Sequence, residues 1–324
     1  MAVDAPATLP NSAAKVGAPR HHTLVFFALL LIMLVAPFVL YPVFLMKVMC
    51  FALFASALNL LLGFGGLLSF GHAAYFGIAA YVSAYTAKVW GLPPELAILL
   101  GTAAAAVLGL LIGALAIRRQ GIYFAMVTLA FAQMVYFFSL QAPFTGGEDG
   151  IQAVPRGRLF GFIDLADDLT FYFVVLAIVT GGMLAIYRII HSPFGQVLKA
   201  IRDNEPRSTS LGYKVDRYKL AVFVMSATLA GLAGAIKALV FQLASLTDVH
   251  WTMSGEVVLM TLLGGMGTIF GPLVGAAVII GMQNYFASFG AWVTVLQGMI
   301  FVISVLLFRE GIVGVISRWI KKPL

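Results

Sequence analysis

The stretch LAILLGTAAAAVLGLLIGALAI, residues 96–117, contains no charged side chain and is followed at once by Arg118 and Arg119. About 20 apolar residues in a helix cross the hydrocarbon core of a bilayer, so this stretch predicts a membrane span. Residues 23–44 also predict a membrane span. The whole chain of 324 residues is 61% hydrophobic. Soluble domains are about half apolar, and transmembrane barrels show short alternating segments instead. We therefore predict an all-α, polytopic transmembrane helical bundle.

The chain divides into a tail, a membrane domain and a second tail. Residues 1–22 are small and polar and predict a disordered N-terminal tail, residues 23–308 the transmembrane domain, and residues 309–324 a C-terminal tail. Besides residues 23–44, six segments fit single spans: 45–62, 67–87, 96–117, 122–140, 171–190 and 220–241. The apolar stretch 257–308 holds three short spans, or one span and a re-entrant segment, which gives about eight to ten spans in total.

The basic residues set the expected orientation. Between Arg188 and Lys219 the chain has seven Lys or Arg and three acidic residues, whereas residues 141–168 have five acidic residues and two Arg. Because Lys and Arg are enriched in cytoplasmic loops, we expect the first loop and both termini inside and the second loop outside. The acidic loop 248–256 fits the outside. This rule also explains the net charge of +7 without nucleic acid.

The segment HSPFGQVLKAIRDNEP, residues 191–206, predicts an amphipathic surface helix. Ser192 suits the N-cap and Pro193 the first helical position. The apolar residues recur at helical spacing and form one stripe: Phe194, Val197, Leu198 and Ile201. Pro206 interrupts the chain, and a second helix is expected to end near residues 211–212. The stripe suits either the lipid interface or the groove of a partner protein, and the mixed charges of residues 202–205 favour the partner.

Two glycine-rich segments resemble each other, GGLLSFGHAAYFGIAAY from Gly65 and GGMGTIFGPLVGAAVII from Gly264. Such breaks in both halves of a transporter indicate a central pathway, although small residues also let helices pack closely. Intramembrane polar residues can line a pathway or bond a neighbouring helix. The candidate path residues are Asn59, Gly65, Gly66, His72, Gly264 and Gly265. Lys47 and Lys237 lie near expected outer ends of spans and are expected to snorkel.

The segment FGQVLKAIRDNEPRSTSLGYKVDRYKL, residues 194–220, resembles the cytoplasmic loop of ABC-importer permeases, and more narrowly the LivM-type branched-chain amino acid permeases. LNLLLGFGGLLSFGHAAYFGIAAY from Leu58, TGGEDGI from Thr145 and SGEVVLMTLLGGMGTIFGPLVGAA from Ser254 agree with that family. These stretches together cover most of residues 45–285, and the N-terminal tail lies outside the resemblance.

The resemblance implies an inner-membrane importer subunit with a coupling loop at residues 191–219. Its partners would be a second, LivH-like permease subunit, two cytoplasmic ATPases and a periplasmic binding protein. The residues expected to couple to the ATPases are Phe194, Gly195, Ala200, Ile201, Arg202, Asp203, Asn204, Glu205, Leu211 and Gly212. Those expected to meet the binding protein are Thr145, Gly146, Gly147, Glu148 and Asp149. The chain has no GxxxxGK[ST] motif and is not the ATPase itself.

Three other functions stay open at this point. An ion-coupled transporter needs intramembrane acids, and the predicted spans hold almost none. A membrane enzyme needs convergent reactive groups, which the isolated Cys50, Asn59 and His72 do not supply. No metal ligand set or cofactor motif stands out. A permease of the same architecture could instead carry urea or short amides, because the binding protein sets much of the selectivity.

Overall fold

The predicted apolar runs form helices in the structure, a computed structural model that describes residues 20–287, 290, 292–307 and 311–320. The long helices of the first half are α1 (Arg20–Val35), α2 (Pro42–Asn59), α3 (His72–Lys88), α4 (Pro94–Ala116), α5 (Ile122–Gln141) and α6 (Asp168–His191). The second half contains α7 (Pro193–Asp203), α8 (Glu205–Ser210), α9 (Val215–Val240), α10 (Leu246–Val249), α11 (Trp251–Gly264), α12 (Gly271–Tyr285), α13 (Trp292–Leu307) and α14 (Gly311–Ile320). Single helical turns occur at η1 (Ala36–Phe38), η2 (Leu60–Phe64), η3 (Pro143–Thr145) and η4 (Gly147–Asp149).

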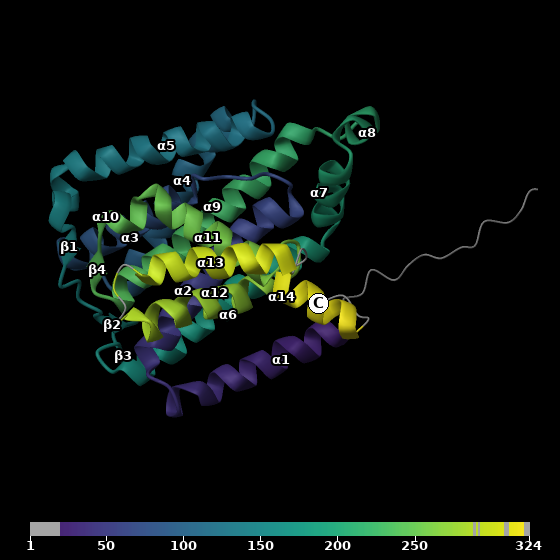
Figure 1. The fold of residues 1–324 in the computed structure, drawn as a ribbon. Coiled ribbons are helices and arrows are strands. Elements are labelled where there is room, and N and C mark those ends of the chain that lie inside the picture. Colours follow the sequence, from purple (N-terminus) through teal and green to yellow (C-terminus); the bar gives the residue numbers. More distant parts are fainter. Residues whose placement is uncertain (1–19, 288–289, 291, 308–310, 321–324) are drawn as a thin grey trace, which may run out of the picture.

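The two ends of the bundle differ. Four two-residue strands form antiparallel pairs, β1 (Ile151–Gln152) with β4 (Leu243–Ala244) and β2 (Arg158–Leu159) with β3 (Ile163–Asp164). Figure 1 shows these strands at one end of the bundle, called the strand end below, and α7 and α8 at the other, called the loop end. The helical content confirms the predicted all-α class, and within the described residues the strands are short pairs that join loops.

Five helices of the described residues are long and apolar enough to cross a membrane, which makes the chain a multi-pass membrane protein. They are Pro42–Phe64, Pro94–Ala116, Ile122–Gln141, Asp168–His191 and Val215–Val240. The region predicted to hold three short spans forms α11, α12 and α13. With 14 and 15 residues, α11 and α12 are each only about 21–23 Å long. They are shorter than a membrane core of about 30 Å.

Two predicted span boundaries are wrong for local reasons. The run 23–44 is not one helix, because α1 ends at Val35, a short turn holding Pro37 follows, and Pro42 opens α2. A proline removes a backbone donor and clashes with the preceding helical turn, which breaks the helix. The span predicted from residue 67 begins as a helix only at His72, because residues 65–71 run without helical structure.

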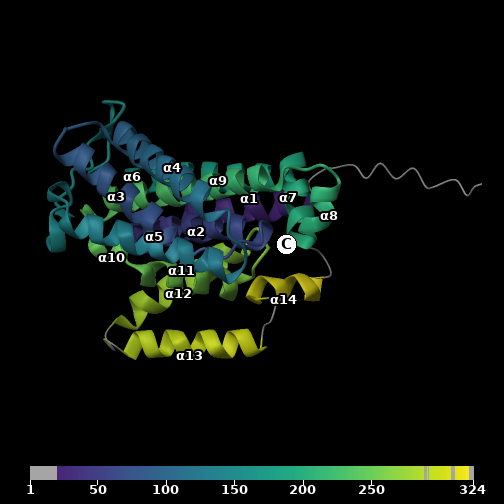
Figure 2. The same cartoon turned by 90° about the horizontal axis from the view of Figure 1, so that it is seen from above.

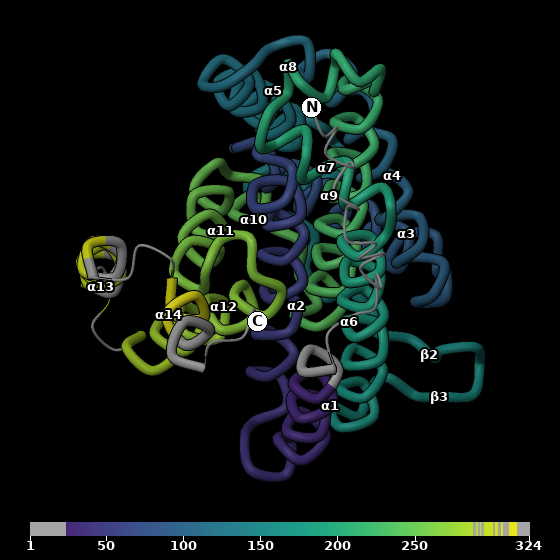
Figure 3. The backbone as a smooth tube through the Cα atoms, turned by 90° about the vertical axis from the view of Figure 1, so that its right-hand side faces the viewer, coloured from purple at the N-terminus to yellow at the C-terminus, as the bar shows by residue number. Residues whose placement is uncertain are grey.

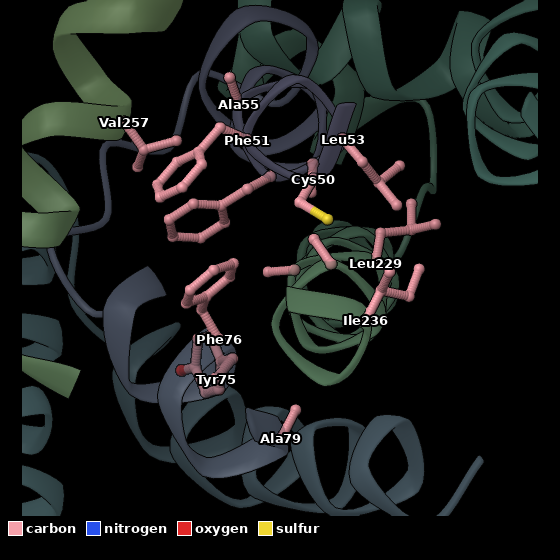
Figure 4. Close-up of a cluster of buried hydrophobic side chains, with 14 of the residues drawn as sticks. Cys50, Phe51, Leu53, Ala55, Tyr75, Phe76, Ala79, Leu229, Ile236 and Val257 are labelled. Carbon is pink, nitrogen blue, oxygen red and sulfur yellow. The ribbon is translucent and has the colours of Figure 1, made fainter. Parts of the chain in front are cut away.

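Helix α2 forms the centre of the bundle, and most of its side chains are buried. Seen from the loop end in Figure 3, it lies between the α11–α12 pair and helices α6 and α9, all of which it contacts. Figure 4 shows part of this core, where Cys50 and Phe51 of α2 face Phe76 of α3 and Ile236 of α9. Phe54 stacks on Phe76 with ring centroids 4.5 Å apart. Cys50 is fully buried, as expected for a small apolar side chain.

Part of the predicted C-terminal tail is helical. Residues 311–320 form α14, which contacts α11 and α12. A Cβ atom on Gly311 would lie only 2.5 Å from the Gly265 nitrogen, so α14 meets the turn between α11 and α12 directly. Figure 2 shows α13 set apart from the rest of the bundle, and Trp292 and Leu306 on it are 68% and 74% exposed. Residues 1–19 of the predicted N-terminal tail, and residues 309–310 and 321–324 of the predicted C-terminal tail, lie outside the described residues.

Lys237 does not snorkel to the membrane surface, contrary to expectation. Its Nζ donates to both carboxylate oxygens of Asp248 at 2.8 and 2.6 Å, and the two side chains are only 10% and 2% exposed. The Ser245 N–H also donates to this carboxylate at 3.1 Å, so Asp248 belongs to a buried network and not to a solvated outer loop. Glu256, predicted in that same loop, lies inside α11 and accepts from Gln283 Nε2 at 3.1 Å.

Candidate functional site

The amphipathic helix at the loop end begins and ends as its sequence predicts. Pro193 starts α7, and the Ser192 Oγ caps it by accepting from the Gly195 N–H at 3.3 Å. Asn204 then caps α8, with its Oδ1 accepting from the Arg207 N–H at 3.0 Å. The second helix ends at Ser210, and its C-cap Leu211 is followed by Gly212 in a left-handed conformation with φ of 89°. Residues 193–210 therefore form two short helices, each with a side-chain N-cap, joined at Asn204.

The apolar stripe of α7 packs against the chain itself. Leu198 and Ile201 are 1% and 2% exposed, and Phe194 stacks on Tyr218 of α9 with ring centroids 5.3 Å apart. The interpretation that this stripe enters a partner's groove is thus wrong, because the transmembrane body already covers it. The loop end instead presents the opposite face of the segment, where the exposed residues include Gln196, Ala200, Arg207, Leu211 and Tyr213.

Within residues 202–205, Arg202 and Glu205 bond to the transmembrane body. Glu205 Oε1 accepts from Lys219 Nζ at 2.7 Å and from Gln120 Nε2 at 3.2 Å. The Lys219 side chain is only 7% exposed, so this ion pair is well shielded on its α9 side. Arg202 donates to Asp203 Oδ1 through Nε and Nη2 at 3.1 and 2.9 Å. Sequence reasoning marked these residues, but it did not find the partners Gln120 and Lys219, which carry no motif.

Lys199 extends the contact between α7 and the body. Its Nζ lies 5.5 Å from the centroid of the Phe64 ring at the end of η2, within the range of a cation–π contact. Burial lowers the pKa of the Lys199 amine, and the neighbouring positive charge of Arg202 lowers it further. The inner face of α7 is thus partly shielded from water as well as apolar.

The two glycine breaks meet at the loop end. Residues 65–71 follow η2, and residues 265–270 join α11 to α12. Asn59 links the two, since its Nδ2 donates to the Thr268 carbonyl at 2.7 Å and its Oδ1 accepts from the Gly267 N–H at 2.9 Å. The contacts between the two breaks run from Asn59 and Gly63 to Gly267 and Thr268. The other candidate path residues of the breaks, Gly65, Gly66, Gly264 and Gly265, lie within three positions of Gly63 or Gly267.

His72 lies apart from that junction, in the packed interior between α3 and α9. Its side chain has no solvent exposure, and its Nε2 lies 2.8 Å from Ser226 Oγ. Its ring meets those of Tyr75 and Phe223 edge to face, with centroids 5.7 and 6.4 Å apart. In this conformation His72 joins two helices of one chain and does not face an open path.

The residues expected to meet a binding protein lie near the strand end and differ in their exposure. Thr145 is fully buried, and its Oγ1 donates to the Ser139 and Ala142 carbonyls at 2.6 Å each. Thr145 therefore stabilises the loop and is too buried to contact a binding protein, contrary to expectation. Gly146, Glu148 and Asp149 are exposed, and Gly147 is partly exposed. Among the described residues no group of three or more His, Cys, Asp and Glu side chains could hold a metal ion.

Comparisons with known proteins agree with this arrangement. The family profile described as "Branched-chain amino acid transport system / permease component" matches residues 42–305. The high-affinity branched-chain amino acid transport system permease protein LivM of Salmonella typhimurium is 28% identical over 84% of this chain and 70% of its own length. Its Escherichia coli counterpart is 27% identical over the same shares. The ribose import permease protein RbsC of Bacillus subtilis is 29% identical over 55% of this chain and 58% of its own. No solved structure matches. The chain belongs to the family of branched-chain amino acid transport permeases.

Proposed function

We propose that this chain is one permease subunit of an ABC importer that moves branched-chain or related small amino acids across the inner membrane. The observation that carries the proposal is the helix pair α7–α8 at the loop end. Its inner face is buried on the transmembrane body, and its outer face is unoccupied among the described residues. Such a surface suits the docking of a cytoplasmic ATPase, which would push on the outer face.

The mechanism follows from how the pair is attached. ATP-driven closure of two ATPases would displace α7 and α8, and the displacement reaches the body only through rigid contacts. The Glu205–Lys219 pair joins α8 to α9, and the Phe194–Tyr218 stack joins α7 to α9. The helix pair would therefore move α9 with it, and this motion alternately opens the path to the two sides. No bond is made or broken in the permease.

The relatives support the cargo and the partners at a coarser level. LivM proteins are permeases of branched-chain amino acid transport, and a LivH permease of Methanocaldococcus jannaschii is 27% identical over 51% of this chain. We infer a second, LivH-like permease subunit, two ATPases and a periplasmic binding protein. The exposed Glu148 and Asp149 are proposed to meet the binding protein.

Purification tests the assembly. The full chain is extracted from its native membrane in mild detergent, and the proteins that accompany it are identified by mass spectrometry. An ATPase and a second permease are expected, and the neighbouring binding protein is then tested with leucine, urea and short amides. A chain that stays alone even after crosslinking would refute the importer and revive an ion-coupled mechanism.

Labelling tests the proposed orientation. In a Cys50→Ala background, a membrane-impermeant maleimide added from outside should label Asp149→Cys at the strand end and spare Arg207→Cys at the loop end. Both native residues are exposed, so burial does not decide the result. The reversed pattern would refute cytoplasmic termini and a cytoplasmic helix pair.

A further inference from the structure

The end of α2 contacts both the coupling segment, defined here as residues 191–214 with α7 and α8, and the second half of the chain. Helix α2 passes into a π-helical turn, η2, whose Gly63 and Phe64 precede the non-helical residues 65–71. Single π-helical turns inside helices are rare and frequently occur at functional sites. Three elements distant in sequence meet here: η2, α7 and the turn 265–270 between α11 and α12.

Asn59 joins this turn to α2 through both ends of its amide. It donates to the Thr268 carbonyl at 2.7 Å and accepts from the Gly267 N–H at 2.9 Å. The side chain is 2% exposed, so water does not replace these bonds. Gly267 has φ of 79°, a conformation that favours glycine, which lets the turn present its N–H to Asn59. The turn is therefore fixed to α2 by a two-sided amide contact.

Gly63 brings the same turn into direct backbone contact with η2. A Cβ atom on Gly63 would lie 2.5 Å from the Gly267 nitrogen and 2.9 Å from its Cα, so only glycine fits. On its other side, the Gly63 carbonyl accepts from Arg202 Nη1 of α7 at 2.6 Å. A Cβ on Gly66 would lie 2.7 Å from Arg202 Cγ, which places the arginine stem against the chain after η2.

The Arg202 guanidinium is held on two sides. Asp203 Oδ1 accepts from its Nε and Nη2, and the remaining Nη1 points to Gly63. The planar fork of arginine supports this double engagement, which a lysine ammonium does not reproduce. A continuous line of contacts thus runs from Arg202 through Gly63 and Asn59 to Gly267 and Thr268.

We propose that Arg202 and Asn59 form a latch that carries displacement of the coupling segment to the α11–α12 turn. The inference rests on the proposed function, since it needs an ATPase that moves α7. The other contacts of α7 lead to α6, α8 and α9, whereas the contact with η2 leads through Asn59 to the second half. Both are positioning residues, because neither needs to touch the cargo. The latch predicts that the two glycine breaks respond to nucleotide as one unit.

Hydrogen–deuterium exchange on the complete transporter in lipid nanodiscs, with and without ATP, tests the latch. The deuterium exchange of residues 191–214 measures motion of the coupling segment. The exchange of residues 265–270 measures whether that motion is transmitted to the α11–α12 turn. Wild-type protein is compared with Arg202→Gln and Arg202→Lys. Arg188→Gln is the matched control, because Arg188 is exposed at the same end and no polar contact of its side chain occurs among the described residues.

The expected result is a nucleotide response at both segments in the wild type and the control. In Arg202→Gln the response should persist at residues 191–214 and fall about two- to thirty-fold at residues 265–270, the range typical of coupling mutations. Arg202→Lys should be intermediate. Leucine uptake per ATP hydrolysed should fall in parallel.

Three outcomes would overturn the idea in different ways. An unchanged response at residues 265–270 in Arg202→Gln refutes the latch and leaves the proposed function intact. A wild-type coupling segment that does not respond to ATP refutes both. In a double-mutant cycle on the same response, Arg202→Gln and Asn59→Leu should not add fully, because both interrupt one route. Full additivity would show two separate routes, and if Asn59→Leu does not assemble, the two Arg202 variants decide alone.

Discussion

The buried pair Lys237–Asp248 gives a prediction whose size follows from the structure. Replacing Lys237 with Met removes two contacts of 2.6 and 2.8 Å and leaves the 2%-exposed Asp248 carboxylate without its cation. Breaking one side of a buried ion pair costs about 3–5 kcal/mol of folding free energy. The Ser245 N–H and Oγ–H still donate to the carboxylate, at 3.1 and 3.2 Å, which places the expected loss near about 3 kcal/mol.

The double variant Lys237→Met with Asp248→Asn separates the charge effect from simple packing. Asparagine keeps an oxygen that can accept from Ser245, so the cap of α10 persists while the unpaired charge disappears. Replacing both members of a buried pair by neutral groups is often close to neutral. We therefore expect the double variant to be more stable than Lys237→Met alone.

The assay is reversible denaturation in detergent, read as the free energy of unfolding for each variant. Lys214→Met serves as a control, since Lys214 is exposed at the loop end. The reasoning is refuted if Lys237→Met loses no more stability than Lys214→Met, or if the double variant is as unstable as the sum of the two single variants. The first result would mean that water reaches the pair, as the predicted snorkelling implies, and the second that the two side chains do not interact.

Two further predictions concern the loop end and helix packing. Glu205→Gln removes the charge that faces the 7%-exposed Lys219, so the permease should lose about 1.5–3 kcal/mol of stability and much of its stimulation of the ATPase, measured as ATP hydrolysis in proteoliposomes. Unchanged stimulation would contradict a fastening role. Gly234→Val should destabilise the fold by about 1–3 kcal/mol or more, because a Cβ there would lie 2.7 Å from the Phe76 carbonyl carbon. Gly181 faces open space, so Gly181→Val should destabilise the fold less in the same denaturation assay.

Local features of the sequence predicted local features of the fold well. The apolar runs became helices, and Ser192 and Pro193 placed the start of α7. These predictions succeeded because the length of an apolar run and the geometry of an N-cap both depend on residues close together in the sequence. The helix break at Pro37 also follows from local sequence, but the long apolar run of residues 23–44 led us to predict one continuous span there.

Relations across the chain could not be predicted in the same way. An amphipathic pattern shows that one face of α7 is apolar but not whether lipid, a partner or the chain itself covers it. The pairing of Asn59 with Thr268 spans 209 positions, and neither residue carries a motif for the other. Lys237 resembled a snorkelling lysine because its partner Asp248 lies beyond the end of its own helix. The GFGG stretch at residues 63–66 predicted a break in the helix, but it did not predict that α7 and the turn 265–270 contact that break.

The charged residues of the coupling segment illustrate why a specific-looking motif need not be a contact surface. A helix that transmits force must be fixed at its base, because a loosely attached segment would absorb the displacement in its own motion. Arg202, Asn204 and Glu205 all bond within the chain, to η2, to the start of α8, and to α9 with the turn before α5. In the proposed importer their bonds would set the rigidity of the segment, while the outer face would determine which partner docks. Substitutions of these three bonded residues should impair coupling while leaving ATPase binding largely intact, whereas substitutions of Ala200 or Leu211, which are exposed and bond to nothing through their side chains, should weaken binding first.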